Sequence, residues 1–476
     1  MSISSKAGQR ILSLLDENSF VEIGSLVTAR ATDFNLKPTE MPNDGCITGY
    51  GVIDGNLVYV YSQDASVLGG TIGEMHAKKI ANLYDYAMKM GAPIIGLVES
   101  AGLRLQESTD ALEAFGAIYK KQVEASGVIP QITAVFGNCG GGLALFPTLT
   151  DFTFMEEKDA KLFVNAPNAL DGNRAEKLDT AAAAFQAKES GIVDFVGDEA
   201  SILAGVRELV SLLPANNEDG DAFTETNDDL NRATADIAGA VGDTSIALSI
   251  LADDNNFVEV KKDYAKDMVT GFLRLNGSTI GAVANRCEVY DEEGKLAEKL
   301  STTLSAKGAE KAAEFVNFCD AFDIPVLTLT NVTGYEATVE NEKAIAKAAA
   351  KLTSAFAGAT IPKVNVVMGK AFGTAYVAMN SKAVGADIVM ALPTAEIGTM
   401  DSKLAAKIMY DGQNADVIDE KAKEYAALQN SVTSAAKRGY VDQIVDPADV
   451  RKYVIGAFEM LYTKSEVRFD KKHGTI

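Results

Sequence analysis

The sequence has no tryptophan and only two histidines, His76 and His473. A histidine-based catalytic triad or a zinc site with several histidine ligands needs more histidine at one place than this chain offers. No CxxC pair joins the four cysteines, which are Cys46, Cys139, Cys287 and Cys319. Neither a zinc ribbon nor a disulfide framework is therefore indicated, and we expect free thiols in a reducing compartment and no metal site.

Positive charge and long apolar runs are also scarce. The 44 lysines and arginines stand against 66 acidic residues, which leaves a formal charge of −22. Such a chain is poorly suited to wrapping nucleic acid or covering an anionic membrane. No run of about 18 apolar residues occurs, and the first residues lack the apolar core of a secretory signal. We therefore expect a soluble, cytoplasmic protein that binds no nucleic acid.

The chain instead carries an internal repeat. An acidic, polar segment at 215–234 reads as a linker between two domains, 1–214 and 235–476. Five stretches recur in order on its two sides: LLDENSFVEIG (14–24) with ILADDNNFVEV (250–260), ITGYGVIDGNLVYV (47–60) with VTGFLRLNGSTIGA (269–282), GAPIIGLVES (91–100) with DIPVLTLTNV (323–332), VIPQITAVFGNCGGGLAL (128–145) with TIPKVNVVMGKAFGTAYV (360–377), and SGIVDFV (190–196) with RGYVDQI (438–444). Near-constant spacing indicates duplication. Helical patterns alternate with short apolar runs, so each half is predicted to be an α/β unit.

The tetrapeptide AMKM around Lys89 matches the sequence that biotin ligases modify in carrier domains. Residues 74–90, however, place apolar groups at helical spacing, with Lys89 among the polar ones. Gly91 is suited to end that helix, and Pro93 prevents its continuation. A biotin acceptor lysine sits instead at the tip of a tight hairpin. We therefore predict that Lys89 is a helical surface lysine and carries no biotin.

Two glycine-containing turns are the candidate sites of chemistry. FGNCGGGLALF (136–146) follows a predicted strand and opens another element, and KAFGTAYVAM (370–379) occupies the equivalent place in the second half. The free amide groups at a helix start can hold a developing oxyanion. A tight strand–helix packing turn would look similar in sequence. Two matched oxyanion turns would suit a reaction with two oxyanions and no side-chain base, in keeping with the shortage of histidine.

Several longer stretches resemble the biotin-dependent carboxyltransferases, which include β-subunits of acyl-CoA carboxylases and α-subunits of sodium-pumping acyl-CoA decarboxylases. The stretches are YVYSQDASVLGGTIGEMHAKKI (59–80), MKMGAPIIGLVESAGLRLQES (88–108), CGGGLALFPTLTDFTFM (139–155), PTAEIGTM (393–400), RGYVDQIVDP (438–447) and KKHGT (471–475). They run in order along nearly the whole chain. The resemblance implies two tandem crotonase-like domains, each a spiral of ββα units.

The resemblance also implies an activity. The N-terminal domain would bind an acyl-CoA and the C-terminal domain carboxybiotin, at an active site formed between two subunits of a hexamer built as a trimer of dimers. Biotin would be carried on a separate protein. The other partners would be a biotin carboxylase or a membrane decarboxylase subunit, and in the second case the chain would lie peripheral to the membrane. Which of the two applies, and which acyl-CoA is used, stays open.

The same resemblance assigns residues. Gly141 and Gly142 would hold the thioester enolate, while Thr374 and Ala375, next to Gly373, would hold the ureido oxygen of biotin, with the register of this second pair open by one residue. Val377 would form an apolar wall for a short acyl chain. The residues implied to line the CoA groove are Ser62, Gly69, Gly70, Gly102 and Arg104.

Some positions depart from the family pattern. Its Ser-Gly-Gly-Ala-Arg stretch is SAGLR (100–104) here, and Asp401 and Ser402 replace a Gly-Ala pair. Two other functions remain as alternatives. A CoA hydratase or isomerase of the same fold would carry a catalytic glutamate where this chain has Ala144, and hydration needs such a carboxylate. A non-catalytic scaffold subunit would not need both glycine turns.

Overall fold

A computed structural model describes residues 2–30, 43–219, 222–291 and 293–467. The terminal stretch 471–475, with His473, lies outside them. The chain divides into an N-terminal unit, Met1–Ala222, and a C-terminal unit, Phe223–Ile476. The division falls within the acidic segment 215–234.

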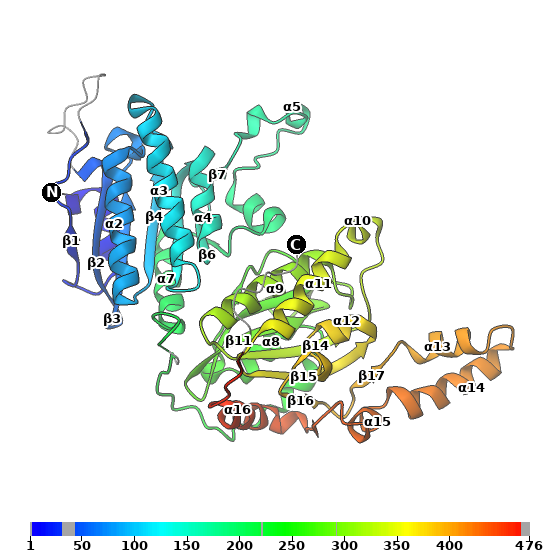
Figure 1. The fold of residues 1–476 in the computed structure, drawn as a ribbon. Coiled ribbons are helices and arrows are strands. Elements are labelled where there is room, and N and C mark those ends of the chain that lie inside the picture. Colours follow the sequence, from blue (N-terminus) through cyan, green and yellow to red (C-terminus); the bar gives the residue numbers. More distant parts are fainter. Residues whose placement is uncertain (1, 31–42, 220–221, 292, 468–476) are drawn as a thin grey trace. The chain divides into compact units, whose positions relative to one another are not determined.

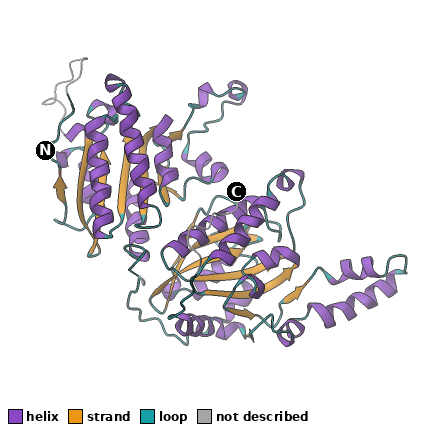
Figure 2. Cartoon of the chain, viewed as in Figure 1, coloured by secondary structure: helices purple, strands orange, loops and turns teal. Residues whose placement is uncertain are grey.

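The N-terminal unit is built on one mixed sheet with the strand order β1-β2-β3-β4-β5-β6-β8, and β7 pairs with β5 (Figures 1 and 2). The strands are β1 Val21–Ile23, β2 Cys46–Ile53, β3 Asn56–Gln63, β4 Ile94–Ser100, β5 Gln131–Gly140, β6 Phe152–Glu156, β7 Lys161–Phe163 and β8 Phe195–Gly197. Neighbours from β1 to β3 are antiparallel, and those from β3 onward are parallel. The apolar runs in β4 and β5 are buried, as strands covered on both faces require.

Helices α2 and α3 lie side by side against this sheet (Figure 1). The helices of the unit are α1 Lys6–Leu14, α2 Glu74–Met90, α3 Thr109–Ala125, α4 Leu145–Leu149, α5 Asn173–Glu176, α6 Ala183–Phe185 and α7 Glu199–Leu212. Helix α2 ends where the sequence predicts, because Gly91 adopts a left-handed conformation (φ +60°) and its N–H bonds back to the last turn. Lys89 is exposed in that turn, so the helical interpretation of AMKM is confirmed.

The C-terminal unit repeats the same topology. Its sheet has the order β9-β10-β11-β14-β15-β16-β18, with β17 paired to β15 as β7 is to β5. The strands are β9 Phe257–Val260, β10 Met268–Leu275, β11 Ser278–Asn285, β14 Val326–Val332, β15 Lys363–Phe372, β16 Ile388–Ala391, β17 Glu396–Gly398 and β18 Gln443–Ile444, and β12 Glu288–Tyr290 and β13 Leu296–Lys299 form a separate ribbon. The prediction of a duplicated α/β unit is confirmed.

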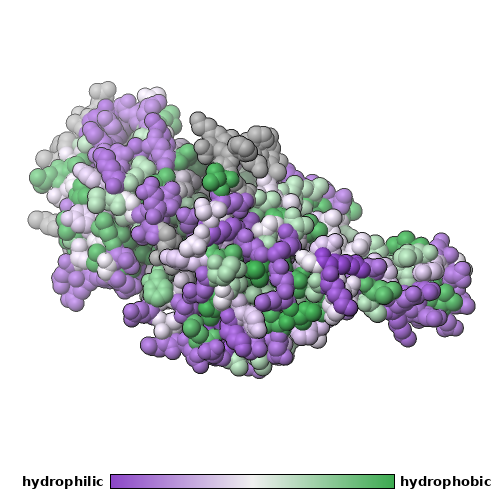
Figure 3. Space-filling view, turned by 60° about the horizontal axis from the view of Figure 1, so that its bottom comes forward, coloured by the Kyte–Doolittle hydropathy of each residue, from purple (hydrophilic) through white to green (hydrophobic). Residues whose placement is uncertain are grey.

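The helices of the C-terminal unit are α8 Thr244–Leu251, α9 Ala306–Ala321, α10 Val339–Glu342, α11 Ile345–Gly358, α12 Gly373–Ala378, α13 Ser402–Met409, α14 Ala415–Tyr425, α15 Val432–Lys437 and α16 Val450–Leu461. Helices α13 and α14 form a hairpin that extends away from the sheet of this unit (Figure 1). Within the described ranges, no helix has the length and apolar character needed to cross a membrane. Figure 3 shows hydrophilic and hydrophobic residues intermixed on the visible surface.

Candidate active site

The glycine turn of the N-terminal unit begins at the carboxyl end of β5. The strand ends at Gly140, and a 3-10 turn, Gly141–Ala144, leads directly into α4. Gly141 has φ +63°, a left-handed conformation that side chains other than glycine rarely adopt. The amide groups of a first helical turn lack intrahelical acceptors, so this turn presents free N–H donors. The predicted order of strand, glycine turn and helix is confirmed, and the oxyanion role of the turn stays a prediction.

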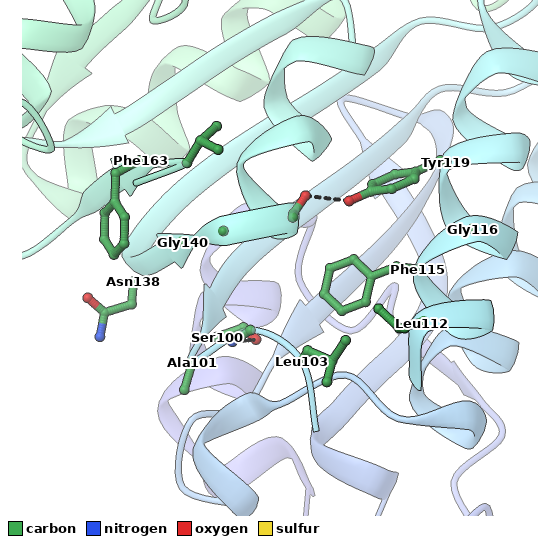
Figure 4. Close-up of a pocket in the computed structure, with 14 residues that line it drawn as sticks. Ser100, Ala101, Leu103, Leu112, Phe115, Gly116, Tyr119, Asn138, Gly140 and Phe163 are labelled. Atoms are coloured by element: carbon green, nitrogen blue, oxygen red, sulfur yellow. Dashed lines mark hydrogen bonds between the residues drawn. The ribbon is translucent and has the colours of Figure 1, made fainter. Parts of the chain in front are cut away.

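These amides lie at a cavity of about 750 Å³ (Figure 4). Its lining comes from the ends of β4, β5 and β7, from the residues that directly follow these strands, and from α3. The lining residues are Ser100, Ala101, Gly102, Leu103, Leu112, Phe115, Gly116, Tyr119, Asn138, Gly140, Gly141, Gly142, Phe163 and Val164. Most of the side chains are apolar, and the polar groups are few. This composition is typical of a pocket for a small organic ligand.

Of the predicted CoA-groove residues, only Gly102 lines the cavity. The turn with Gly69 and Gly70 packs against the loop that carries Gly102, because the N–H of Ala101 in that loop donates to the carbonyl of Gly69 at 2.9 Å. Gly70 is held at φ +65°, and a Cβ there would be 2.5 Å from the carbonyl oxygen of Glu99. Glycine at position 70 is therefore required for the loop to pack against the end of β4.

Arg104 does not face the cavity. Its side chain is completely buried and pairs with Asp44 at 2.5 Å and with Glu107 at 3.0 Å. Its Nε also donates to the hydroxyl of Thr71 at 3.3 Å. Burial raises the pKa of Asp44, although the Arg104 charge opposes that shift. The guanidinium thus joins three segments beneath the loop that carries Gly102, and any direct contact with CoA stays a prediction.

Ser62 is likewise buried, within β3, and does not line the cavity. His76, the one histidine among the described residues, lies in α2 beneath the same loops. Its Nδ1 is 2.9 Å from the carbonyl oxygen of Asp44, and its Nε2 is 3.2 Å from the amide nitrogen of Gln63. Burial, together with the charge of Arg104, lowers the pKa of His76 to about 3. His76 is therefore a neutral structural residue.

Two residues that the sequence analysis did not single out belong to the site. Phe115 and Tyr119 both come from α3 and form part of the cavity wall (Figure 4). The hydroxyl of Tyr119 donates a hydrogen bond to the carbonyl oxygen of Gly142 at 2.5 Å. Their spacing of four residues was the available signal, because it places both rings on one helix face. The sequence does not indicate which element that face meets.

The second glycine turn has the same construction. Strand β15 ends at Phe372, and Gly373 begins α12 with φ +65°. Thr374 is exposed, Ala375 is buried and Val377 is half-buried. The left-handed residue is the clearest marker of register, and it equates Gly141 with Gly373. By this count the pair Gly141–Gly142 corresponds to 373–374, one residue before the pair that the family resemblance assigns.

Comparison with known proteins agrees with this architecture. The carboxyl transferase domain family matches residues 5–476. The propionyl-CoA carboxylase beta chain of Roseobacter denitrificans is 38% identical, over 99% of this chain and 93% of its own length. The methylmalonyl-CoA decarboxylase subunit alpha of Propionigenium modestum is 36% identical, over 99% of this chain and 92% of its own.

A solved structure shares the whole fold. One chain of the transcarboxylase 12S crystal structure, determined with hydrolysed methylmalonyl-coenzyme A bound, superposes with a TM-score of 0.91 at 35% identity, over 99% of this chain and 93% of that one. The prediction of two crotonase-like domains is thereby confirmed. The chain belongs to the carboxyl transferase family and is a carboxyltransferase of the kind found in biotin-dependent acyl-CoA carboxylases and decarboxylases.

Proposed function

We propose that the cavity of the N-terminal unit binds the acyl end of a short-chain acyl-CoA, and that the Gly141–Gly142 turn holds its thioester oxygen. The observation that carries this proposal is the meeting of the left-handed turn with an apolar cavity of about 750 Å³. Loss of the α-proton turns the thioester into an enolate, whose oxygen gains negative charge. Backbone N–H groups aimed at that oxygen stabilise the charge without any side-chain acid.

The turn at Gly373 is the corresponding site for biotin. Thr374 is exposed at the start of this turn and leaves it open to a ligand that offers a carbonyl-type oxygen. Thr374 and Ala375 contribute backbone N–H groups irrespective of their side chains. Carboxybiotin supplies CO2 when it is bound there. In the carboxylation direction the acyl α-carbon would give its proton to the ureido nitrogen that the departing CO2 leaves as an anion, and would then form a bond to that CO2. In decarboxylation the same bond would break and the proton would return to the α-carbon.

The proposal includes separate partner chains. Biotin reaches the site on a carrier protein, and a biotin carboxylase or a membrane decarboxylase subunit completes the system. The hexamer described for transcarboxylase 12S supports a homo-hexamer here, arranged as a trimer of dimers. We place this assembly in the cytoplasm, where a membrane decarboxylase partner would hold it peripherally.

The test is exchange of a carboxyl group between a carboxyacyl-CoA, such as methylmalonyl-CoA, and free biotin, followed with labelled carboxyl carbon. The purified full-length oligomer is expected to transfer label only when both compounds are present. A hydratase would instead consume an unsaturated acyl-CoA, and a scaffold subunit would do neither. Absence of exchange from a folded oligomer that still binds the CoA ester would contradict the proposed function.

A further inference from the structure

We propose that Tyr119 is a positioning residue for carboxyl transfer, because its hydroxyl holds the Gly141–Gly142 turn in the orientation that aims its amides at the substrate oxygen. This inference rests on the proposed function of that turn. Tyr119 lies near the middle of α3 and lines the cavity. Its hydroxyl donates a hydrogen bond to the carbonyl of Gly142, which is 23 residues away in sequence.

The hydrogen bond from Tyr119 restricts the direction in which the N–H groups of the glycine turn point. The Tyr119 hydroxyl is 2.5 Å from the carbonyl oxygen of Gly142 (Figure 4). In a helical turn the carbonyls point toward one end and the N–H groups toward the other. Since the peptide group is planar, fixing the Gly142 carbonyl also fixes the N–H of Leu143. The same constraint limits ψ at Gly142, so the whole first turn keeps its orientation.

The Tyr119 ring is itself held by neighbouring rings. The centroid of Tyr119 is 6.0 Å from that of Phe115 and 5.9 Å from that of Phe146, and both pairs meet edge to face. Phe115 and Phe146 are buried. Aromatic pairs at this spacing are attractive beyond the area they bury, so the hydroxyl is presented from a fixed position.

Glycine at position 142 is what permits the contact. A Cβ there would be 2.9 Å from the hydroxyl oxygen of Tyr119, closer than real Cβ contacts allow. Gly141, by contrast, has open space beside it and is explained by its positive φ alone. The two positions thus require glycine for different reasons. Gly141 adopts a backbone conformation that other residues rarely adopt, and Gly142 leaves room for the Tyr119 hydroxyl.

The Tyr119 hydroxyl positions the backbone and does not donate a proton to the substrate. A phenol has a single proton, and here that proton is directed at the Gly142 carbonyl. Burial raises the pKa of Tyr119, which keeps the phenol protonated as a donor at neutral pH. Its effect on the reaction is therefore through the backbone that it holds.

The test replaces Tyr119 by phenylalanine, which keeps the ring and removes only the hydroxyl. We expect kcat for carboxyl exchange to fall about tenfold, in line with the loss of one good hydrogen bond, while KM for the acyl-CoA stays within about twofold. The matched control is Tyr86→Phe on α2, because Tyr86 is exposed and outside the cavity lining. It is expected to behave as the wild type.

A second measurement does not depend on catalysis. Hydrogen exchange of the peptide covering 139–146 in the intact oligomer should be faster in Tyr119→Phe and unchanged in Tyr86→Phe. The positioning role would be overturned if the 139–146 peptide exchanged hydrogen at the same rate in Tyr119→Phe and in the wild type. It would also be overturned if kcat for carboxyl exchange were unchanged, or if only KM changed. A wild-type oligomer without any exchange activity would instead contradict the proposed function, and the hydrogen-exchange result would still decide whether Tyr119 holds the turn.

Discussion

Gly141 and Gly373 hold the same left-handed backbone conformation, at φ +63° and +65°, directly after equivalent strands of the two units. Each residue converts the end of a buried strand into the start of a short helix, and each therefore exposes first-turn amides. Duplication alone explains why the two turns have the same shape. The proposed reaction would use both turns, one for the enolate oxygen of the acyl-CoA and the other for the ureido oxygen of biotin.

Gly142→Pro is expected to abolish carboxyl transfer, because proline removes the N–H that we propose as a donor to the enolate oxygen. Loss of one oxyanion donor costs about 3 kcal/mol, or more than a hundredfold in kcat. Gly142→Ala keeps the N–H but displaces the Tyr119 hydroxyl, so we expect a smaller loss. Steady-state carboxyl exchange measures both variants. Circular dichroism and oligomer size serve as controls for folding, and a folded proline variant of near-normal rate would move the enolate site elsewhere.

Lys89 is expected to remain unmodified. It lies in the last turn of a regular helix, whereas biotin ligases act on a hairpin lysine. The measurement is an avidin blot of the protein made together with an active biotin ligase, with an authentic carrier protein as the positive control. A labelled band that disappears in Lys89→Arg would show the prediction to be wrong.

Val377→Asp is expected to change the preference among short acyl-CoAs. Val377 lies in α12, four residues after Gly373, and is half-buried. Discrimination of one methylene in an apolar pocket is worth about 1–3 kcal/mol, so the relative kcat/KM should shift at least about tenfold. The comparison uses acetyl-, propionyl- and butyryl-CoA, with Val377→Ile as an apolar control. Unchanged relative rates in a folded aspartate variant would mean that Val377 is an ordinary packing residue.

The stability of the protein should fall in mild acid because of His76. Burial lowers the folded-state pKa of His76 to about 3, below its ordinary value of 6.5. Between these values the unfolded chain binds more protons, so the His76 contribution is complete above about pH 6.5 and is lost as the pH falls. The loss is on the order of 1.4 kcal/mol per pH unit.

Denaturant unfolding at pH 7 and pH 5 measures this effect. The free energy of unfolding should drop more for the wild type than for His76→Gln, whose side chain does not titrate. Protonation of carboxylates lowers the free energy of unfolding equally in both proteins. The difference between the two drops is therefore the contribution of His76. An equal drop in the two proteins would indicate that His76 titrates normally in the folded state.

Much of this protein follows from local sequence patterns. The helix at 74–90 and its end at Gly91 were predictable because helical periodicity and a left-handed glycine act over a few residues. The duplication was predictable because five ordered stretches keep their spacing. The turns after β5 and β15 were predictable because glycines at the end of an apolar run have few other uses.

Only the tertiary structure decided which side chains meet around those turns. Arg104 is assigned to a CoA groove by resemblance, yet it is buried against Asp44, which is 60 residues away. Tyr119 carries no motif, yet it contacts the carbonyl of Gly142. Contacts of this kind depend on how α3 and the loops pack against the carboxyl ends of the strands. Periodicity indicates that a helix face is buried and leaves open which distant atoms it will touch, because that choice is made by the packing of the whole unit.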